Sequence, residues 1–257
     1  MMIGDRTIET KWWGPAPDVA PTLVLLHEGL GCVALWRDFP EKLAVATGWG
    51  VFAYSRFGYG NSDPVTLPRP MSYMHDEALT VLPHVLDAAG IRRPVLLGHS
   101  DGGSIAAIYA GAAPDSRIAG IVMMAAHFFV EDLNIVSIRA IKRTYEQGDL
   151  RPRLARYHRD VDMAFRGWND AWLDPRFRAF NITEQVAQIR VPVLAMQGTD
   201  DPYGTGEQLR ALERAARCPV ETRLIKAARH SPHLEAPEAT LDAILPFVRS
   251  VSLEATA

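Results

Sequence analysis

The chain has 257 residues, of which 48% are hydrophobic and 22% are charged, and its formal net charge is −3. This length and balance suit one large globular domain, or one domain with an inserted subdomain. The weak negative charge and the lack of a Lys/Arg block argue against a nucleic-acid partner, and no apolar run suggests a signal peptide or a membrane partner.

The N-terminal third of the chain combines predicted strands with predicted helices. An irregular hairpin is expected over residues 3–18. The continuous apolar runs Thr22–Leu26 and Gly50–Tyr54 follow, and such runs are typical of strands buried on both faces. Each run ends in a glycine-rich loop. One helix pattern begins near Trp36, and another extends over about residues 71–89.

The sequence around Ser100 predicts a strand, a sharp turn and a helix. The apolar run Val95–Leu97 leads into a glycine-x-serine-x-glycine motif, which a helical pattern follows. Gly98 and Gly102 are the small neighbours that a serine at the apex of a strained turn requires. The helix N-terminus and the Asp101 amide would point at an oxyanion formed beside the serine. The motif alone also fits an ordinary strand-to-helix turn, so the partners of Ser100 must come from elsewhere.

Three more apolar runs continue the pattern at about residues 118–125, 191–196 and 220–225. Short apolar strands that alternate with helices predict an α/β fold with a mainly parallel, doubly wound sheet and helices on both faces. Ligands of such sheets bind beyond the carboxyl ends of the strands, which is where the glycine-rich loops fall.

Residues 127–187 interrupt this alternation. They read as several short helices with no strand, and about sixty residues is too long for an ordinary connection, so we expect an inserted helical lid. Residues 1–126 and 188–257 then form the core domain. The large aromatic residues of the lid could form its own small core or line a substrate pocket, and Trp168 and Trp172 are the candidates for substrate binding.

Two further loops follow strands at the same end of the predicted sheet. The first contains Asp200 and Asp201, and the second contains His230 and His233. Carboxylates in such loops are usually turn residues or helix caps, and a surface position would explain either histidine. However, the chain order of serine, aspartate and histidine is the one that hydrolases of this architecture require.

With these motifs the chain resembles the α/β-hydrolase family over nearly its whole length. The resemblance implies that Ser100 is the nucleophile. The family's acid stands three residues after a glycine, which places it on Asp201, with Asp200 as the alternative. The family's base precedes a Glu-x-Pro segment, and His230 fits this pattern better than His233.

The resemblance also covers the loop after the first apolar run. The family's oxyanion loop begins His-Gly-x and reaches a tryptophan nine residues on, and counting from His27 to Trp36 fits without an insertion. Glu28 then stands where glycine is usual, and Gly29 supplies the oxyanion amide together with Asp101. Shifting the alignment by one residue makes Leu30 the donor.

Three side chains near this loop have open roles. Glu28 places a carboxylate near the site, and Glu28 and Trp36 are candidate substrate contacts. The Asp101 carboxylate could cap the helix that begins there. Alternatively, Asp101 or Glu28 could pair with a nearby arginine and shape the acyl pocket. The segment from Arg56 to Ser62 resembles a family loop that is mostly structural.

Serine at the turn favours acyl transfer to water. His230 would take the Ser100 proton, and Asp201 would orient the imidazole. We therefore predict a hydrolase that cleaves an ester or thioester of a small acyl substrate. The resemblance also allows hydrolysis of a carbon–carbon bond in ring-fission products of aromatic degradation, which arginines in the pocket would favour, or a non-catalytic ligand-binding role.

The remaining predictions concern cofactors and location. The proposed chemistry needs no metal or organic cofactor. Cys32 and Cys218 lie far apart in the sequence without metal-ligand spacing. Two reduced thiols in a cytoplasmic protein are therefore expected. The sequence does not indicate an oligomeric state.

Overall fold

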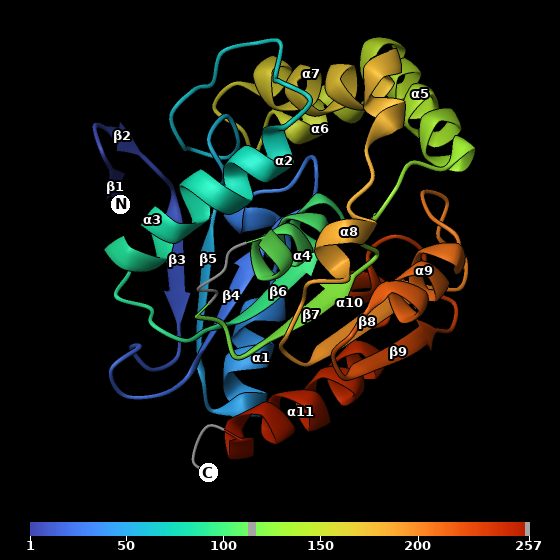
Figure 1. Ribbon diagram of the computed structural model, residues 1–257. Helices are drawn as coiled ribbons and strands as arrows, with labels where there is room; N and C mark the ends of the chain where they lie inside the picture. The colour runs from blue at the N-terminus through green and yellow to red at the C-terminus, as the bar shows by residue number, and fades with distance from the viewer. Residues whose placement is uncertain (113–116, 255–257) are drawn as a thin grey trace.

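The computed structural model of the protein describes residues 1–112 and 117–254 (Figure 1). Its main sheet consists of Thr10–Trp13 (β3), Thr22–Leu26 (β4), Gly50–Tyr54 (β5), Val95–His99 (β6), Gly120–Met124 (β7), Val193–Gly198 (β8) and Val220–Ile225 (β9). Within the described residues the strand order is β3-β5-β4-β6-β7-β8-β9. Among the described strands of this sheet, the edge strand β3 alone runs antiparallel to its neighbour. The predicted mainly parallel sheet is confirmed.

Alternate side chains of the central strands pack on opposite faces of the sheet, as the two-residue period of a strand requires. In β4, Leu23 and Leu25 join one core cluster, whereas Val24 and Leu26 join the other. The first face is covered by α1 (Phe39–Thr47) and α11 (Pro237–Glu254). The second face is covered by α3 (Leu82–Ala88), α4 (Asp101–Ala112), α8 (Thr183–Val186) and α9 (Glu207–Ala215). The two helix layers explain why the central strands are apolar along their whole length.

The two early helix patterns form with local irregularities. The pattern near Trp36 is a 3₁₀ turn, η1 (Val33–Trp36), followed by α1, whose C-cap residue Gly48 has a left-handed φ of 72°. The helix expected over residues 71–89 consists of α2 (Tyr73–Asp76), the π-helical turn η2 (Glu77–Val81) and α3. Within the described part of the chain, no helix is both long enough and apolar enough to cross a membrane.

The segment 127–187 is described throughout and forms no strand beyond one isolated bridge. Its helices are α5 (Asp132–Gln147), α6 (Leu150–Leu154), α7 (Val161–Leu173), η3 (Pro175–Ala179) and α8. In Figure 1, α5, α6 and α7 lie together at the top, beyond the carboxyl ends of the parallel strands. In contrast, α8 packs so closely on α4 that a β-carbon on Gly111 would lie 1.9 Å from the Gln185 carbonyl oxygen. The part of the segment that stands apart from the sheet therefore ends before α8.

The hairpin predicted over residues 3–18 is wrong in its pairing. The structure pairs Met2–Ile3 (β1) with Arg6–Thr7 (β2), whereas β3 joins the edge of the main sheet beside β5. At this edge the ring of Trp12 lies 5.3 Å from that of Phe52. An isolated two-stranded hairpin is at best marginally stable in water, and pairing with the large sheet avoids this limit.

Candidate active site

Ser100 lies at the apex of a sharp turn between β6 and α4, with a φ of 53°. A side-chain-bearing residue in this region costs about 1–3 kcal/mol, and a 2.8 Å hydrogen bond from the Ser100 amide to the Met124 carbonyl helps to hold it. A β-carbon on Gly98 would lie 2.2 Å from the Gly102 carbonyl oxygen, and one on Gly102 would lie 1.9 Å from that of Leu26. The small neighbours are therefore a steric requirement of the turn.

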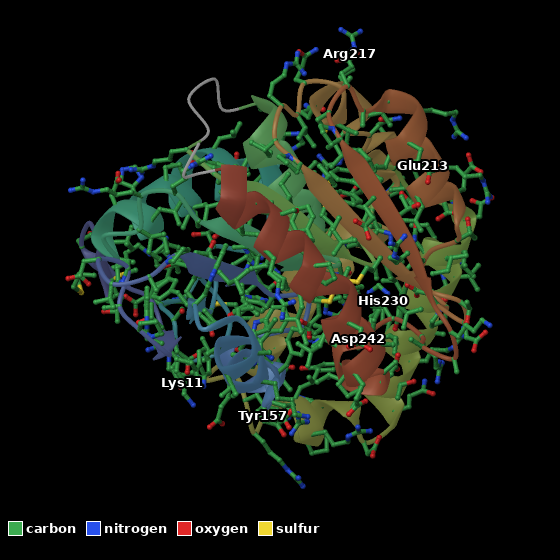
Figure 2. The ribbon with its side chains drawn as sticks, turned by 90° about the horizontal axis from the view of Figure 1, so that it is seen from below. Lys11, Tyr157, Glu213, Arg217, His230 and Asp242 are labelled. Atoms are coloured by element: carbon green, nitrogen blue, oxygen red, sulfur yellow. The ribbon has the colours of Figure 1, made fainter. Side chains whose placement is uncertain are left out.

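The structure brings Ser100 together with His230 and Asp201. Ser100 Oγ lies 2.9 Å from His230 Nε2, and His230 Nδ1 lies 2.9 Å from Asp201 Oδ2. Because Nδ1 faces a carboxylate, it carries the proton, and Nε2 is free to accept a hydrogen bond from the serine hydroxyl. His230 is half-buried, and in the view of Figure 2 it projects near the middle of the molecule, whereas Lys11 and Arg217 project at its rim.

The Asp201 carboxylate is held in place by hydrogen bonds from nearby residues. Its Oδ1 accepts a 2.8 Å hydrogen bond from the Tyr203 amide, and its Oδ2 accepts one from Gln197 Nε2. Burial alone would raise the pKa of Asp201, but the hydrogen bond from His230 and its electrostatic attraction for the carboxylate outweigh burial and lower the pKa. The carboxylate therefore stays ionised beside the imidazole.

The two alternatives for these positions lie elsewhere. Asp200 is exposed, and its amide donates to the Ala228 carbonyl. His233, in the short helix α10 (Pro232–Glu235), is buried with its ring 5.0 Å from the Trp36 ring and 5.2 Å from the Phe39 ring. Neither side chain approaches Ser100.

A cavity of about 170 Å³ opens beside Ser100 and His230. It is lined by Glu28, Gly29, Leu30, Ser100, Asp101, His127, Asn134, Ile138, Trp168, Trp172, Tyr203 and His230. The predicted contacts Glu28, Trp168 and Trp172 are therefore at the cavity. The two tryptophans come from α7, four residues apart on one face of that helix.

Trp36 does not line the cavity, which corrects its assignment as a substrate contact. Only 2% of its surface is exposed, and its ring packs among Phe39, His99 and His233. The turn η1 directs the indole into the core cluster between the sheet and α1. The spacing from His27 marks a position in the family pattern and does not place this side chain in the cavity.

Gly29 and Leu30 both lie at the cavity wall. The indole of Trp168 packs so closely on Gly29 that a β-carbon there would lie 2.1 Å from Trp168 Nε1. Among the residues that the structure describes, none accepts a hydrogen bond from the Gly29 amide. Glycine at this position thus allows α7 to close over the loop and leaves an amide donor at the cavity.

The Glu28 side chain folds back over its own loop toward His99. Glu28 Oε2 lies 3.5 Å from His99 Nδ1, and a β-carbon on Gly31 would lie 2.3 Å from the same oxygen. His99 Nε2 in turn lies 2.6 Å from the His230 carbonyl oxygen. Burial opposes charge on both groups, but their mutual attraction outweighs it, lowering the pKa of Glu28 and raising that of His99. The Glu28 carboxylate therefore lies at the cavity wall with the His99 imidazole as its partner.

The Asp101 carboxylate does not cap α4. It is fully buried and accepts hydrogen bonds from Tyr73 Oη at 2.7 Å and from Trp172 Nε1 at 3.2 Å. Arg56 Nη2 lies 4.0 Å from Asp101 Oδ2, so the alternative of a pairing with an arginine fits the structure. Burial raises the pKa of Asp101 against the opposing effect of Arg56. The Asp101 carboxylate therefore interacts with residues that are distant in sequence and not with the first backbone amides of α4.

Four residues of the cavity wall are not predicted by any sequence pattern above: His127, Asn134, Ile138 and Tyr203. His127 follows the strand β7, so the rule that ligands bind beyond carboxyl ends could have found it. Burial lowers the pKa of His127 to about 3, so its imidazole is neutral. Asn134 and Ile138 share one face of α5, but no local pattern shows which face of a helix meets a cavity.

Comparison with known proteins agrees with this architecture. The sequence profile described as "Alpha/beta hydrolase family" matches residues 23–243. Carboxylesterase YbfK of Bacillus subtilis is 27% identical to the chain over 266 aligned residues, which cover 96% of this chain and 86% of the relative.

Two further known proteins are similar to the chain, one over less than half of its length and the other over nearly all of it. A 2-hydroxy-6-oxononadienedioate/2-hydroxy-6-oxononatrienedioate hydrolase of Paraburkholderia xenovorans is 33% identical over 123 residues, which cover 47% of this chain and 41% of the relative. The crystal structure of proline iminopeptidase from Mycobacterium smegmatis superposes with a TM-score of 0.79 at 20% identity, covering 99% of this chain and 98% of that one. At this identity, the structural likeness concerns the fold alone.

Proposed function

Because the chain belongs to the α/β-hydrolase family, we propose that it is a serine hydrolase that cleaves the ester or thioester bond of a small acyl substrate. One observation supports this proposal above the others. A continuous hydrogen-bonded chain runs from Ser100 through His230 to Asp201, and it opens on a cavity. This is the arrangement that activates a serine hydroxyl.

The proposed reaction proceeds through an acyl-enzyme. Ser100 Oγ attacks the carbonyl carbon while His230 Nε2 accepts the hydroxyl proton, and the carbonyl oxygen becomes an oxyanion. The amides of Gly29 and Asp101 stabilise this oxyanion, and in a well-studied protease each such donor is worth about 2.7–4 kcal/mol. When the oxyanion collapses, the bond to the leaving group breaks, and His230 gives its proton to the departing alcohol or thiol. A water molecule then repeats the sequence on the acyl-enzyme and releases the acid.

The walls of the cavity favour an uncharged acyl group. Within the described residues no arginine or lysine lines the cavity, and the Glu28 carboxylate at its wall already has His99 as its partner. The substrate named for the Paraburkholderia relative is a dioate, which carries two carboxylates for which the lining offers no arginine or lysine. The cavity therefore supports an ester or thioester over the carbon–carbon bond alternative.

The helices α5, α6 and α7 act as a lid in this proposal. Residues from α5 and α7 form one side of the cavity, and the segment 127–187 that contains them lies between β7 and β8. Residues 1–126 and 188–257 then supply the catalytic core.

The test is covalent labelling with a small fluorophosphonate, followed by mass spectrometry of the intact protein. Wild-type protein should gain one adduct, and Ser100→Ala should gain none. The variant should keep its melting temperature and lose hydrolysis of p-nitrophenyl acetate by on the order of 10⁴- to 10⁶-fold, because the remaining groups cannot form the acyl-enzyme.

Acyl-CoA thioesters, assayed beside the p-nitrophenyl esters, would separate thioesterase from esterase activity. A wild-type protein that neither reacts with the probe nor hydrolyses any of these substrates would contradict the proposal. The non-catalytic ligand-binding alternative would then be the one to pursue.

A further inference from the structure

We propose that Arg56 is a positioning residue of the oxyanion hole, which orients and polarises the peptide whose amide binds the oxyanion. This inference deepens the proposed function and depends on it. The sequence pattern had suggested only a structural part for the loop that contains Arg56.

Two side chains hydrogen-bond the backbone carbonyl group of Glu28. The Glu28 carbonyl oxygen accepts a hydrogen bond from Arg56 Nη2 at 2.8 Å and another from His27 Nδ1 at 2.7 Å. This carbonyl and the Gly29 amide belong to the same planar trans peptide, so they point in opposite directions. Two donors behind the carbonyl therefore turn the Gly29 N–H away from Arg56, toward the side of the peptide that faces the cavity.

The backbone amide of residue 56 determines which nitrogen of His27 carries a proton, and this hydrogen bond does not depend on the arginine side chain. The Arg56 backbone amide donates a 3.0 Å hydrogen bond to His27 Nε2, which must therefore be unprotonated. Burial, together with the positive charge of Arg56, lowers the pKa of His27 well below its usual range and keeps it neutral. Its single proton lies on Nδ1, where it donates to the Glu28 carbonyl.

The second proposed oxyanion donor is tied to the same guanidinium. Arg56 Nη2 lies 4.0 Å from Asp101 Oδ2, and the amide of Asp101 is the partner of the Gly29 amide in the proposed hole. Arg56 follows β5, Gly29 follows β4 and Asp101 follows β6, and these three strands are neighbours in the sheet. One buried cation thus links the loops that carry the two donors.

The burial of Arg56 argues for a role beyond stability. Only 3% of the residue is exposed, and no described residue hydrogen-bonds its Nε or Nη1. Asp101 and the ring of Tyr59, 5.1 Å from the guanidinium carbon, compensate the charge in part. A buried charge with unmade hydrogen bonds is costly. A cation fixed behind the peptide that meets a developing negative charge stabilises the transition state without reorganisation.

The test compares Arg56→Met with a matched variant, Arg69→Met. The Arg69 guanidinium also packs on Tyr59, at 4.9 Å, but it donates to the Phe57 carbonyl and not to the Glu28–Gly29 peptide. With p-nitrophenyl acetate, Arg56→Met should lower kcat about 10- to 100-fold while KM stays within about threefold, a smaller loss than removal of a whole oxyanion donor. Arg69→Met should leave kcat within about threefold of wild type.

A pair of ketones separates oxyanion stabilisation from pocket shape. Trifluoroacetophenone accepts Ser100 at its carbonyl carbon and becomes an oxyanion, whereas acetophenone binds without this addition. Arg56→Met should weaken inhibition by the trifluoromethyl ketone about 10- to 100-fold and leave inhibition by acetophenone unchanged. Arg56→Lys keeps a charge but loses the planar guanidinium, and it should fall between wild type and Arg56→Met in both measurements.

Three results would overturn the assignment of Arg56. The first is a folded Arg56→Met with wild-type kcat, and the second is an equal loss of affinity for both ketones. If Arg56→Met does not fold, a folded Arg56→Lys with wild-type values is the third. Wild-type protein without turnover or ketone inhibition would instead overturn the proposed function, so the two failures are distinguishable.

Discussion

At the residue scale, two adjacent carboxylates in one loop have different surroundings. Asp201 accepts hydrogen bonds from His230, Tyr203 and Gln197, whereas the Asp200 side chain faces solvent. The family pattern favoured Asp201 but left Asp200 open. The carboxylate that is buried against the imidazole is the one that can hold the histidine in the tautomer that Ser100 needs.

Asp201→Asn should lower kcat by about 10⁴-fold, the size of the effect of the equivalent change in a well-studied protease. The amide nitrogen can donate to His230 Nδ1, which would force the proton onto Nε2 and block acceptance from Ser100. Asp200→Asn is the matched control and should stay within about twofold of wild type. Steady-state hydrolysis of p-nitrophenyl acetate measures both, and equal losses in the two variants would remove the assignment of Asp201.

At the element scale, α7 connects the proposed lid to the catalytic core. Asp160 is the N-cap residue of this helix, and its carboxylate accepts a 2.9 Å hydrogen bond from the Met163 amide. Trp168 of α7 packs on Gly29, and Trp172 of α7 donates to Asp101. A single helix thus contacts both proposed oxyanion donors and also limits the size of the cavity.

Trp168→Ala should therefore enlarge the cavity and change the acyl-chain preference. We expect the ratio of kcat/KM for p-nitrophenyl octanoate to that for p-nitrophenyl acetate to rise about tenfold or more, in the range that pocket contacts of this size supply. Trp49→Ala removes the same side chain outside the cavity and should leave the ratio unchanged. An unchanged ratio in Trp168→Ala would show that α7 does not limit the acyl group.

At the scale of the whole molecule, folding buries several histidines in the neutral form. Burial lowers the pKa of His27, His127 and His233, in the case of His127 to about 3. Below pH 6.5 the unfolded chain binds protons that the folded chain does not, so stability falls as the pH decreases toward the folded pKa values. The pKa of His99 is raised, so both states are protonated below pH 6.5 and His99 does not offset this fall.

Replacing His233 with phenylalanine should reduce this acid sensitivity. His233 Nδ1 has no partner in the described part of the chain, and the ring packs against Trp36 and Phe39. The slope of unfolding free energy against pH between pH 6.5 and 5 should decrease by up to about 1.4 kcal/mol per pH unit, the value for one proton. Urea unfolding followed by circular dichroism gives this slope, with the exposed His84→Ala as the control. A slope as steep as that of wild type would show that His233 does not take up the proton on unfolding.

Features that depend on neighbours along the chain could be predicted from local sequence patterns. The buried strands follow from uninterrupted apolar runs, and the turn at Ser100 follows from the steric need for Gly98 and Gly102. The mainly parallel sheet, the helices on both faces and the family resemblance were predicted from these patterns and confirmed. These features could be predicted because their physical causes act over a few residues.

Contacts between side chains from distant segments became visible with the three-dimensional fold. In the fold, Trp36 is buried in the core and His127 lines the cavity. The Asp101 carboxylate accepts hydrogen bonds from Tyr73 and Trp172. The fold also brings Arg56 behind the Glu28 carbonyl, a contact across 28 positions of the chain. A side chain's direction and partners depend on packing between strands and helices that are far apart in sequence, and no local pattern contains that information.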